Sequence, residues 1–277
     1  DAVANGFKKN DRGQLIMACG TGKTFTTLWV KEKISAKSTL VLLPSLSLLS
    51  QTLREWAFAA TKSFDVLCVC SDKSVGKRSD EDEIIHSVTE LPFPVTSDTK
   101  EIRTFLKGKG RKVIFSTYQS SPLIAESQRK PGVPTFDLVI ADEAHRCAGK
   151  TGTEFTTVLD DKKIKAKKRL FTTATPRTYS VSLKKSASEK GVEITDMDNE
   201  EVFGKEFFKL NFGEAIERGL LTDYQVIIVG VDDPMIGEWI EKRKLVETKS
   251  GEITNAESLA SQIGLIKAIK KYDLKRM

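Results

Sequence analysis

The sequence has no apolar run of about 18 residues or more, so it offers no candidate transmembrane helix. Its first residues, DAVANGFKKND, also lack the long apolar core of a secretion signal. We therefore predict a cytoplasmic protein with no membrane partner.

Cysteine is scarce as well, with four residues: Cys19, Cys68, Cys70 and Cys147. So few cysteines do not suggest a disulfide-stapled fold, and we predict that all are reduced thiols. Cys68 and Cys70 lie one residue apart in a predicted strand, and no second cysteine pair completes a zinc site.

Neither sign of charge dominates the chain. Lys and Arg number 44 and Asp and Glu number 38, which gives a net charge of +6. This mild excess is compatible with a polyanionic partner such as DNA but does not require one. The densest basic run, KKIKAKKR at 162–169, is interpreted as a solvated surface segment rather than a DNA-binding stripe.

Short apolar runs alternate with helix-like stretches along most of the chain. The runs predicted as buried strands are 14–18, 39–43, 65–70, 112–117, 137–141 and 169–173. Predicted helices cover 24–36 and follow two N-cap residues, Ser45 and Asp98. This alternation predicts an α/β fold with a mostly parallel sheet flanked by helices. Residues 71–97 are predicted as a long surface connection, and 178–212 as a stretch that returns the chain toward a domain boundary.

The segment MACGTGKT, residues 17–24, has the pattern of a phosphate-binding loop between a strand and a helix. Its glycines permit a tight turn that brings backbone N–H groups to phosphate oxygens, at the positive end of the following helix. Lys23 supplies a mobile positive charge, and Thr24 a hydroxyl for Mg²⁺. The candidate ATP-binding residues are Gly20, Thr21, Gly22, Lys23 and Thr24. Met17 occupies the place of the pattern's first glycine, and a chance glycine turn is the alternative interpretation.

A second candidate, LVIADEAH at 138–145, is an apolar strand that ends in two carboxylates. The carboxyl edge of a parallel sheet is where its ligands bind. Asp142 can hold Mg²⁺ through water, and Glu143 can orient and polarise an attacking water. The alternative is a solvated acidic loop, which is weakened by the phosphate loop upstream in the same alternating fold.

These segments resemble the motifs of superfamily 2 helicase-like ATPases. MACGTGKT, ADEAH and TTATPR (172–177) are similar to motifs I, II and III, while LLPSLSLLSQ (42–51) and FSTYQS (115–120) resemble motifs Ia and Ib. The segments RGQLIMACGTGKT, STYQSS and GLLTDY resemble the motor modules of type I, type III and, above all, type ISP restriction-modification enzymes. The resemblance implies a RecA-like domain that uses ATP and Mg²⁺.

The resemblance also implies a role for individual residues. Lys23, Asp142 and Glu143 would be catalytic, and Thr24 and Asp142 would hold Mg²⁺. His145, Thr173 and Thr175 would report the nucleotide state to the DNA-contacting surface. The residues that would contact the nucleic-acid backbone are Ser45, Gln51, Thr117 and Ser120. A plain helix cap is the alternative for Ser45, and an exposed histidine the alternative for His145.

Compared with the family, the sequence covers one domain and the start of another. We predict a first RecA-like domain at 1–222 without the adenine-reading glutamine that usually precedes motif I. Residues 223–277 would form the crossover and a truncated second RecA-like domain, with a helix over 256–277. Motif IV and the motif VI arginine are absent from the sequence. We therefore expect a fragment of a larger protein that binds Mg·ATP but hydrolyses it poorly alone.

The predicted function is that of an ATP-dependent DNA translocase or helicase motor serving a restriction-modification enzyme. Its predicted partners are nucleic acid, above all double-stranded DNA, and other domains of the parent polypeptide or restriction complex. Two alternatives stay open: a nucleic-acid-binding switch that uses ATP without motor activity, and a phosphate-loop kinase. The sequence does not decide between DNA and RNA, or between unwinding and translocation.

Overall fold

The computed structural model describes residues 1–70, 93–191, 193–223, 245–247, 253–255, 264–265, 269 and 271. The chain divides into two compact units, Asp1–Leu221 and Thr222–Met277. In the second unit, β11 (Leu245–Glu247) pairs antiparallel with β12 (Ile253–Asn255). Most of the predicted crossover and of the predicted helix over 256–277 lies outside the described residues, as does 71–92 of the predicted surface connection.

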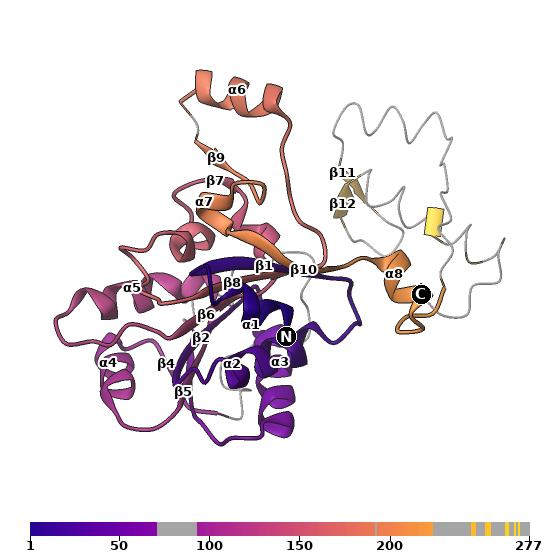
Figure 1. Cartoon of the computed structure of the whole chain (residues 1–277). Coiled ribbons are helices and arrows are strands. Elements are labelled where there is room, and N and C mark those ends of the chain that lie inside the picture. The colour runs from indigo at the N-terminus through magenta and orange to yellow at the C-terminus, as the bar shows by residue number, and fades with distance from the viewer. Residues whose placement is uncertain are drawn as a thin grey trace. The chain divides into compact units, whose positions relative to one another are not determined.

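The first unit is built on a parallel sheet of eight strands, which confirms the predicted α/β class (Figure 1). Its order is β10-β1-β8-β6-β2-β5-β3-β4. The strands are β1 (Arg12–Met17), β2 (Ser38–Leu43), β3 (Asp65–Val69), β4 (Val95–Thr96), β5 (Lys112–Thr117), β6 (Leu138–Ala141), β8 (Arg169–Thr173) and β10 (Lys205–Leu210). All six predicted strands are present, with ends that shift by at most two residues.

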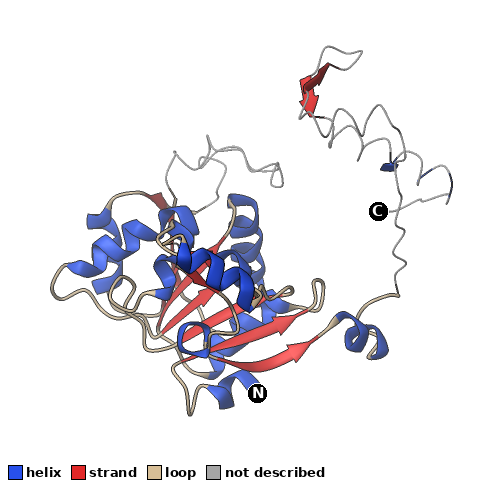
Figure 2. Cartoon of the chain, turned by 90° about the horizontal axis from the view of Figure 1, so that it is seen from above, coloured by secondary structure: helices blue, strands red, loops and turns tan. Residues whose placement is uncertain are grey.

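Helices cover both faces of the sheet (Figure 2). One core contains residues of α1 (Ala2–Gly6), α2 (Lys23–Lys33), α3 (Leu46–Ala59) and α8 (Phe212–Glu217). The other contains residues of α4 (Thr99–Lys107), α5 (Ser121–Arg129), α7 (Glu200–Phe203) and the 3₁₀ turns η4 (Ala144–Cys147) and η5 (Glu154–Leu159). Successive residues of β2 serve opposite cores, with Val41 in the first and Leu42 in the second, as the two-residue period of a strand requires. No described helix is long and apolar enough to cross a membrane.

Both predicted N-caps are confirmed. The Ser45 hydroxyl accepts a hydrogen bond from the Leu48 N–H at 3.3 Å, and an Asp98 carboxylate oxygen accepts one from the Lys100 N–H at 2.7 Å. Each satisfies an N–H that the first helical turn leaves without an intrahelical partner.

The segment 178–212 contains structure that the sequence pattern did not predict. It forms α6 (Val181–Glu189), which lies on an extension beyond the sheet in Figure 1, and β9 (Ile194–Thr195), which pairs with β7 (Gly149–Lys150). It then supplies β10, the edge strand beside β1. Its sequence, KEFFKL, has charged residues where a buried strand would have apolar ones, because β10 is exposed over much of its length.

Contacts of Gln14 and Gly13 hold β10 and the residues before it against β1. The buried Gln14 amide donates hydrogen bonds to the carbonyls of Met197 and Gly204, at 2.8 and 2.9 Å. Gly13 has no side chain, and the Phe207 ring fills that space, so a Cβ at Gly13 would overlap the ring. The observed packing of Phe207 at this edge of the sheet therefore requires glycine at position 13.

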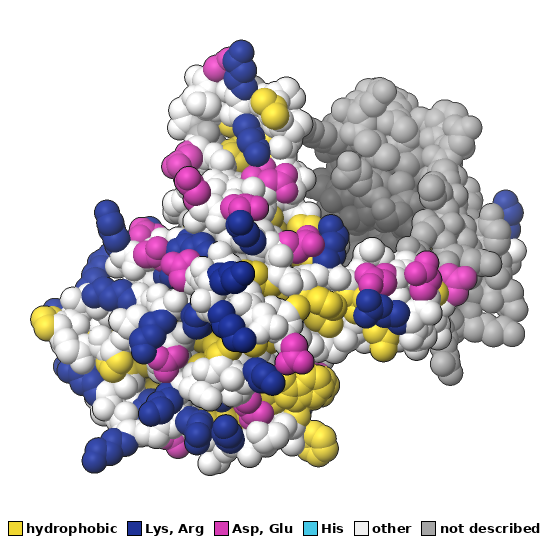
Figure 3. All heavy atoms as spheres, in the orientation of Figure 1, with side chains coloured by type: hydrophobic (Ala, Val, Ile, Leu, Met, Phe, Trp, Pro, Cys, Tyr) yellow, Lys and Arg dark blue, Asp and Glu magenta, His cyan; other side chains and the backbone are white. Residues whose placement is uncertain are grey.

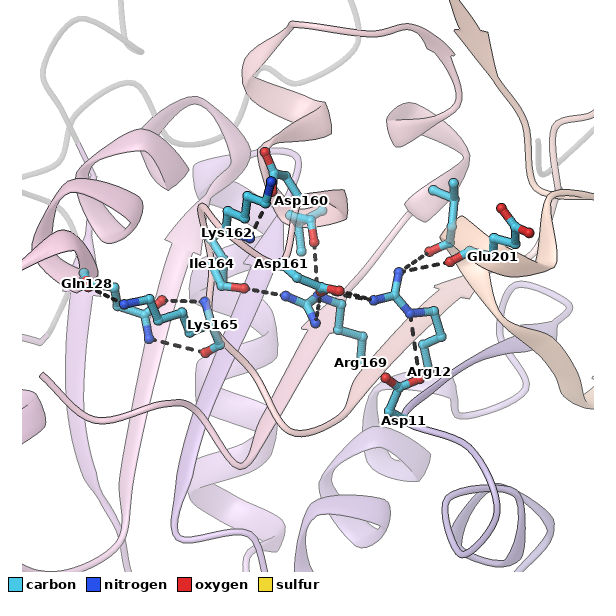
Figure 4. A network of polar contacts seen from close by, with 12 residues as sticks. Asp11, Arg12, Gln128, Asp160, Asp161, Lys162, Ile164, Lys165, Arg169 and Glu201 are labelled. Carbon is cyan, nitrogen blue, oxygen red and sulfur yellow. Dashed lines mark hydrogen bonds and ion pairs between the residues drawn. The ribbon is translucent and has the colours of Figure 1, made fainter.

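Two guanidinium groups share one carboxylate at the amino end of β1 and β8 (Figure 4). Arg12 donates to both oxygens of Asp161 at 2.9 and 2.7 Å, and Arg169 pairs with the same carboxylate at 2.5 Å. Arg169 also donates to the carbonyls of Val158 and Ile164. The interpretation of 162–169 as solvated surface is thus wrong for Ile164 and Arg169, which are 0% and 3% exposed. Arg169 ties β8 to the preceding loop.

Replacing Gly13 with alanine should destabilise the first unit by about 1–3 kcal/mol, the usual cost of an overpacked core. The added methyl would displace Phe207 and loosen β10, which urea unfolding would detect. Gly213→Ala in α8 is the matched control, because a Cβ there meets only an ordinary contact at 3.5 Å. Equal stability of the two variants would show that Phe207 does not depend on Gly13.

Asp161→Asn should cost about 1.5–3 kcal/mol of unfolding free energy, the range for hydrogen bonds to charged groups. Two largely buried guanidinium groups would lose their shared negative charge, although the 61% exposure of the Asp161 side chain lets water offset part of that loss. Asp160→Asn is the control, since it keeps an acceptor for the Lys162 N–H. A thermal melt that does not separate these neighbouring variants would contradict the prediction.

Candidate nucleotide-binding site

The two sequence candidates meet at the carboxyl edge of the sheet. β8 lies between β1 and β6 and pairs in parallel with both. The loop after β1 leads directly into Lys23, the first residue of α2. The turn after β6 contains Asp142 and Glu143, and β8 ends at Thr173. Parallel pairing thus brings together segments that are more than a hundred residues apart in sequence.

The loop has the backbone that phosphate binding requires. Gly20 and Gly22 have φ of 80° and 85°, in the left-handed region that favours glycine. A Cβ on Gly22 would meet nothing within 4 Å, so this side of the loop is open. Thr21 donates its hydroxyl to the Ala18 carbonyl at 2.6 Å and closes the turn. Met17 is the last residue of β1 and is buried, so the departure from the common pattern falls in the strand rather than in the cradle.

α2 begins at Lys23 and is anchored beneath the loop. The Thr24 carbonyl accepts hydrogen bonds from the Trp56 indole N–H at 3.1 Å and from the Thr27 hydroxyl at 2.7 Å. Trp56 belongs to α3 and is fully buried, which fixes the start of α2 against the core.

Lys23 faces both carboxylates. Its Nζ donates to Glu143 Oε1 at 2.9 Å and lies 4.0 Å from Asp142 Oδ1. Burial alone would lower the pKa of Lys23, but the two carboxylates outweigh it and raise that pKa. Burial likewise acts to raise the pKa of Glu143, yet His145 and Lys23 hold it at about 2. The pKa of Asp142 is raised, because burial outweighs the attraction of Lys23 and the hydrogen bond from Thr172.

The predicted coupling residues extend this cluster. His145 Nδ1 lies 2.9 Å from Thr173 Oγ1 and 3.3 Å from Glu143 Oε2. The Thr175 N–H donates to Thr173 Oγ1 at 3.1 Å. A continuous polar path therefore runs from Glu143 through His145 to the segment after β8.

Sequence reasoning missed two residues that hold Asp142. Thr172 donates its hydroxyl to Asp142 Oδ1 at 2.6 Å, and Tyr118 donates its hydroxyl to the Asp142 carbonyl at 2.6 Å. The Thr172 contact follows from strand register, since Ala141 pairs with Phe171 and the next residues then lie side by side. Only the order and register of the strands would have revealed it.

The predicted nucleic-acid contacts lie farther along the same edge, and their role stays a prediction. Thr117 is the last residue of β5, and Ser45 follows the neighbouring strand β2. Thr117 and Ser120 are each 1% exposed, with their hydroxyls 3.2 Å apart. Gln51 is exposed and donates to Glu55 Oε1 at 2.8 Å. In this conformation a ligand could reach Gln51 through its side chain, but it could reach Thr117 and Ser120 only through nearby backbone.

Basic side chains do not form a single stripe on the face of the first unit shown in Figure 3. Lys and Arg are spread widely there, with Asp and Glu among them. Charge on this face therefore does not mark a path for a polyanion.

The fold and the cluster together define a RecA-like phosphate-loop domain of the helicase type. The chain belongs to the family described as "Type III restriction enzyme, res subunit", whose model matches residues 1–178. This confirms the resemblance to the superfamily 2 helicase-like module of restriction-modification enzymes.

Solved structures and a viral protein show the same relationship. The type ISP restriction-modification enzyme LlaBIII bound to DNA is 36% identical with a TM-score of 0.64, over 81% of this chain and 16% of that chain. A nuclease-deletion mutant of the type ISP enzyme LlaGI in complex with a DNA substrate mimic is 34% identical with a TM-score of 0.60, over 87% and 21%. Probable helicase A859L of African swine fever virus (isolate Pig/Kenya/KEN-50/1950) is 30% identical, over 86% of this chain and 24% of that protein. The chain thus spans a quarter or less of the length of these relatives.

All four cysteines are free thiols, as predicted, but their environments differ. Burial raises the pKa of Cys68, Cys70 and Cys147 to about 12, whereas Cys19 is exposed in the phosphate loop. The buried thiols are almost entirely protonated at pH 8, and the thiolate is the reactive form.

A thiol-reactive disulfide reagent at pH 8 should therefore modify one cysteine per native chain, at Cys19, and all four after denaturation. Absorbance of the released thiol would count them, and Cys19→Ser should abolish the rapid native reaction. Rapid modification of a second cysteine in the native chain would contradict the burial described above.

Proposed function

We propose that this chain is the first motor domain of an ATP-dependent DNA translocase or helicase, serving a restriction-modification enzyme. The observation that carries the proposal is the convergence of Lys23, Asp142 and Glu143 at the carboxyl edge of the sheet, with Glu143 connected through His145 to Thr173. A phosphate cradle beside a water-activating carboxylate suits phosphoryl transfer to water.

The residues present fit ATP and Mg²⁺. Gly20, Thr21 and Gly22 provide an open turn at the N-terminus of α2, where backbone N–H groups and the helix dipole favour phosphate. Thr24 and Asp142 would supply oxygen ligands for Mg²⁺. The described residues contain no cluster of three or more acidic, His or Cys side chains able to cage a metal. Mg²⁺ commonly binds one or two carboxylates together with substrate phosphates, and the Asp142 carboxylate is of this kind.

Each catalytic side chain then has a distinct task. Lys23, now paired with Glu143, would neutralise outer phosphate charge, and bound Mg²⁺ would add further stabilisation of that charge. Glu143 is ionised at neutral pH and would orient the attacking water once Lys23 turns to phosphate. His145, Thr173 and Thr175 would carry the change to the rest of the domain.

Hydrolysis would require the second RecA-like domain, which we assign to begin in 223–277 after a first domain at 1–222. In related phosphate-loop enzymes an arginine supplied to the transferring phosphoryl group contributes about 10³–10⁵ in rate. The isolated 277-residue chain should therefore bind Mg·ATP and turn it over slowly.

Nucleic acid, above all duplex DNA, is the proposed partner. Two similar type ISP enzymes were solved with DNA or a DNA mimic. The sugar-phosphate backbone of the nucleic acid would be contacted by Ser45, Gln51, Thr117 and Ser120. Such contacts give affinity without base specificity. Other domains of the parent protein would complete the motor.

ATP hydrolysis by the natural protein that carries this sequence should be stimulated by duplex DNA. Glu143→Gln should lower turnover by about 10²–10⁴-fold, the range for a general base, while retaining Mg·ATP binding. Lys23→Ala should weaken binding of a fluorescent ATP analogue as well. Lys33→Ala is the matched control, because Lys33 is on the same helix with a side chain that is 65% exposed.

Turnover that duplex DNA, single-stranded DNA and RNA all leave unchanged would refute the motor. Retained ATP binding would then favour the nucleotide switch, and transfer to a small hydroxyl acceptor would favour the kinase. Fast DNA-stimulated turnover by the 277-residue chain alone would refute the need for a second domain.

A further inference from the structure

Tyr118 connects two segments that the proposed function treats separately. It opens the 3₁₀ turn η3 (Tyr118–Ser120), directly after β5, and lies beside the predicted nucleic-acid contacts Thr117 and Ser120. Its hydroxyl donates to the Asp142 carbonyl at 2.6 Å. The ring is fully buried and stacks on Phe155, with centroids 5.1 Å apart.

Packing against Phe155 explains why an aromatic ring occupies position 118. It does not explain why the Tyr118 hydroxyl is bonded to the Asp142 carbonyl. A buried tyrosine needs a partner for its hydroxyl, and Tyr118 uses the carbonyl directly before Glu143. Asp142 is otherwise held by a hydrogen bond from its N–H to the Leu42 carbonyl at 2.9 Å and by Thr172 at its carboxylate. Among these contacts, the one from Tyr118 comes from the segment that contains the nucleic-acid candidates.

The Asp142 carbonyl matters because of the conformation of Glu143. Glu143 has φ 48° and ψ 46°, in the left-handed region that residues with a side chain rarely adopt. The Asp142 carbonyl and the Glu143 N–H belong to one planar peptide unit. A hydrogen bond that fixes the orientation of this carbonyl therefore also restricts the φ angle of Glu143. This φ helps to direct the Glu143 carboxylate toward Lys23 and His145. Strained residues of this kind persist where the surrounding contacts hold them.

We propose that Tyr118 is a positioning residue that couples the Thr117–Ser120 turn to Glu143, an inference that rests on the proposed function. A shift of η3 on nucleic-acid binding moves the Tyr118 hydroxyl, and the Asp142–Glu143 peptide then turns with it or loses its bond. Either response changes where the Glu143 carboxylate lies relative to Lys23. This path is separate from the one through His145 and Thr173, and it reaches Glu143 through the backbone.

The test measures DNA affinity of the natural protein with and without a non-hydrolysable ATP analogue and Mg²⁺. The ratio of the two dissociation constants is the coupling, which is typically about 5- to 150-fold in allosteric proteins. Tyr118→Phe removes the hydroxyl alone and should lower the ratio toward 1, while the path through His145 and Thr173 retains the remainder. Phe155→Leu removes the stacked ring but keeps the hydroxyl, so it should lower the melting temperature while keeping the ratio.

Hydrogen exchange on the wild-type protein gives a second readout that does not depend on a variant. DNA without nucleotide should alter amide exchange in 138–147. Unchanged exchange there, or a wild-type ratio in Tyr118→Phe, would overturn the coupling role of Tyr118 alone. A wild-type protein whose DNA affinity does not respond to nucleotide would overturn the proposed function and this inference together.

Discussion

The pairing of β8 between β1 and β6 is the constraint on which the site depends. In a parallel sheet these strands end at one edge, so the loops after β1 and β6 open beside each other. Thr172 and Thr173 come from the strand between them and bond to Asp142 and His145. Any change in register of β8 would separate the threonines from both partners, while each local motif stayed intact in sequence.

The same strands have opposite charge arrangements at their two ends. At the amino end, Arg12 and Arg169 share the single carboxylate of Asp161. At the carboxyl end, the carboxylates of Asp142 and Glu143 share the single ammonium group of Lys23. The first cluster closes on protein carbonyls and serves structure. The second leaves an excess of acceptors beside an open loop, which is a suitable place for a cation and a phosphate chain.

Much of this architecture could be predicted because local patterns and global fold agree. Six buried strands, two helix caps and the phosphate loop each follow from a short stretch of sequence. β10 could not be predicted, because an exposed edge strand has no apolar run and its docking depends on Gly13 and Gln14, far away in sequence. Thr172 and Tyr118 were missed for a related reason: their partner, Asp142, directly follows another strand, and contact between different strands depends on their order and register.

The position of β10 also bears on how this domain is to be produced. The family model ends at residue 178, before β10 begins. A protein cut at that limit would expose the edge of β1, whose second half, Leu15–Met17, is apolar and buried in the complete sheet. Unpaired apolar edges of this kind recruit strands from other molecules, and natural sheets protect them with charges such as those of Lys205, Glu206 and Lys209. The limit of the family match and the limit of the folding unit therefore differ in this chain.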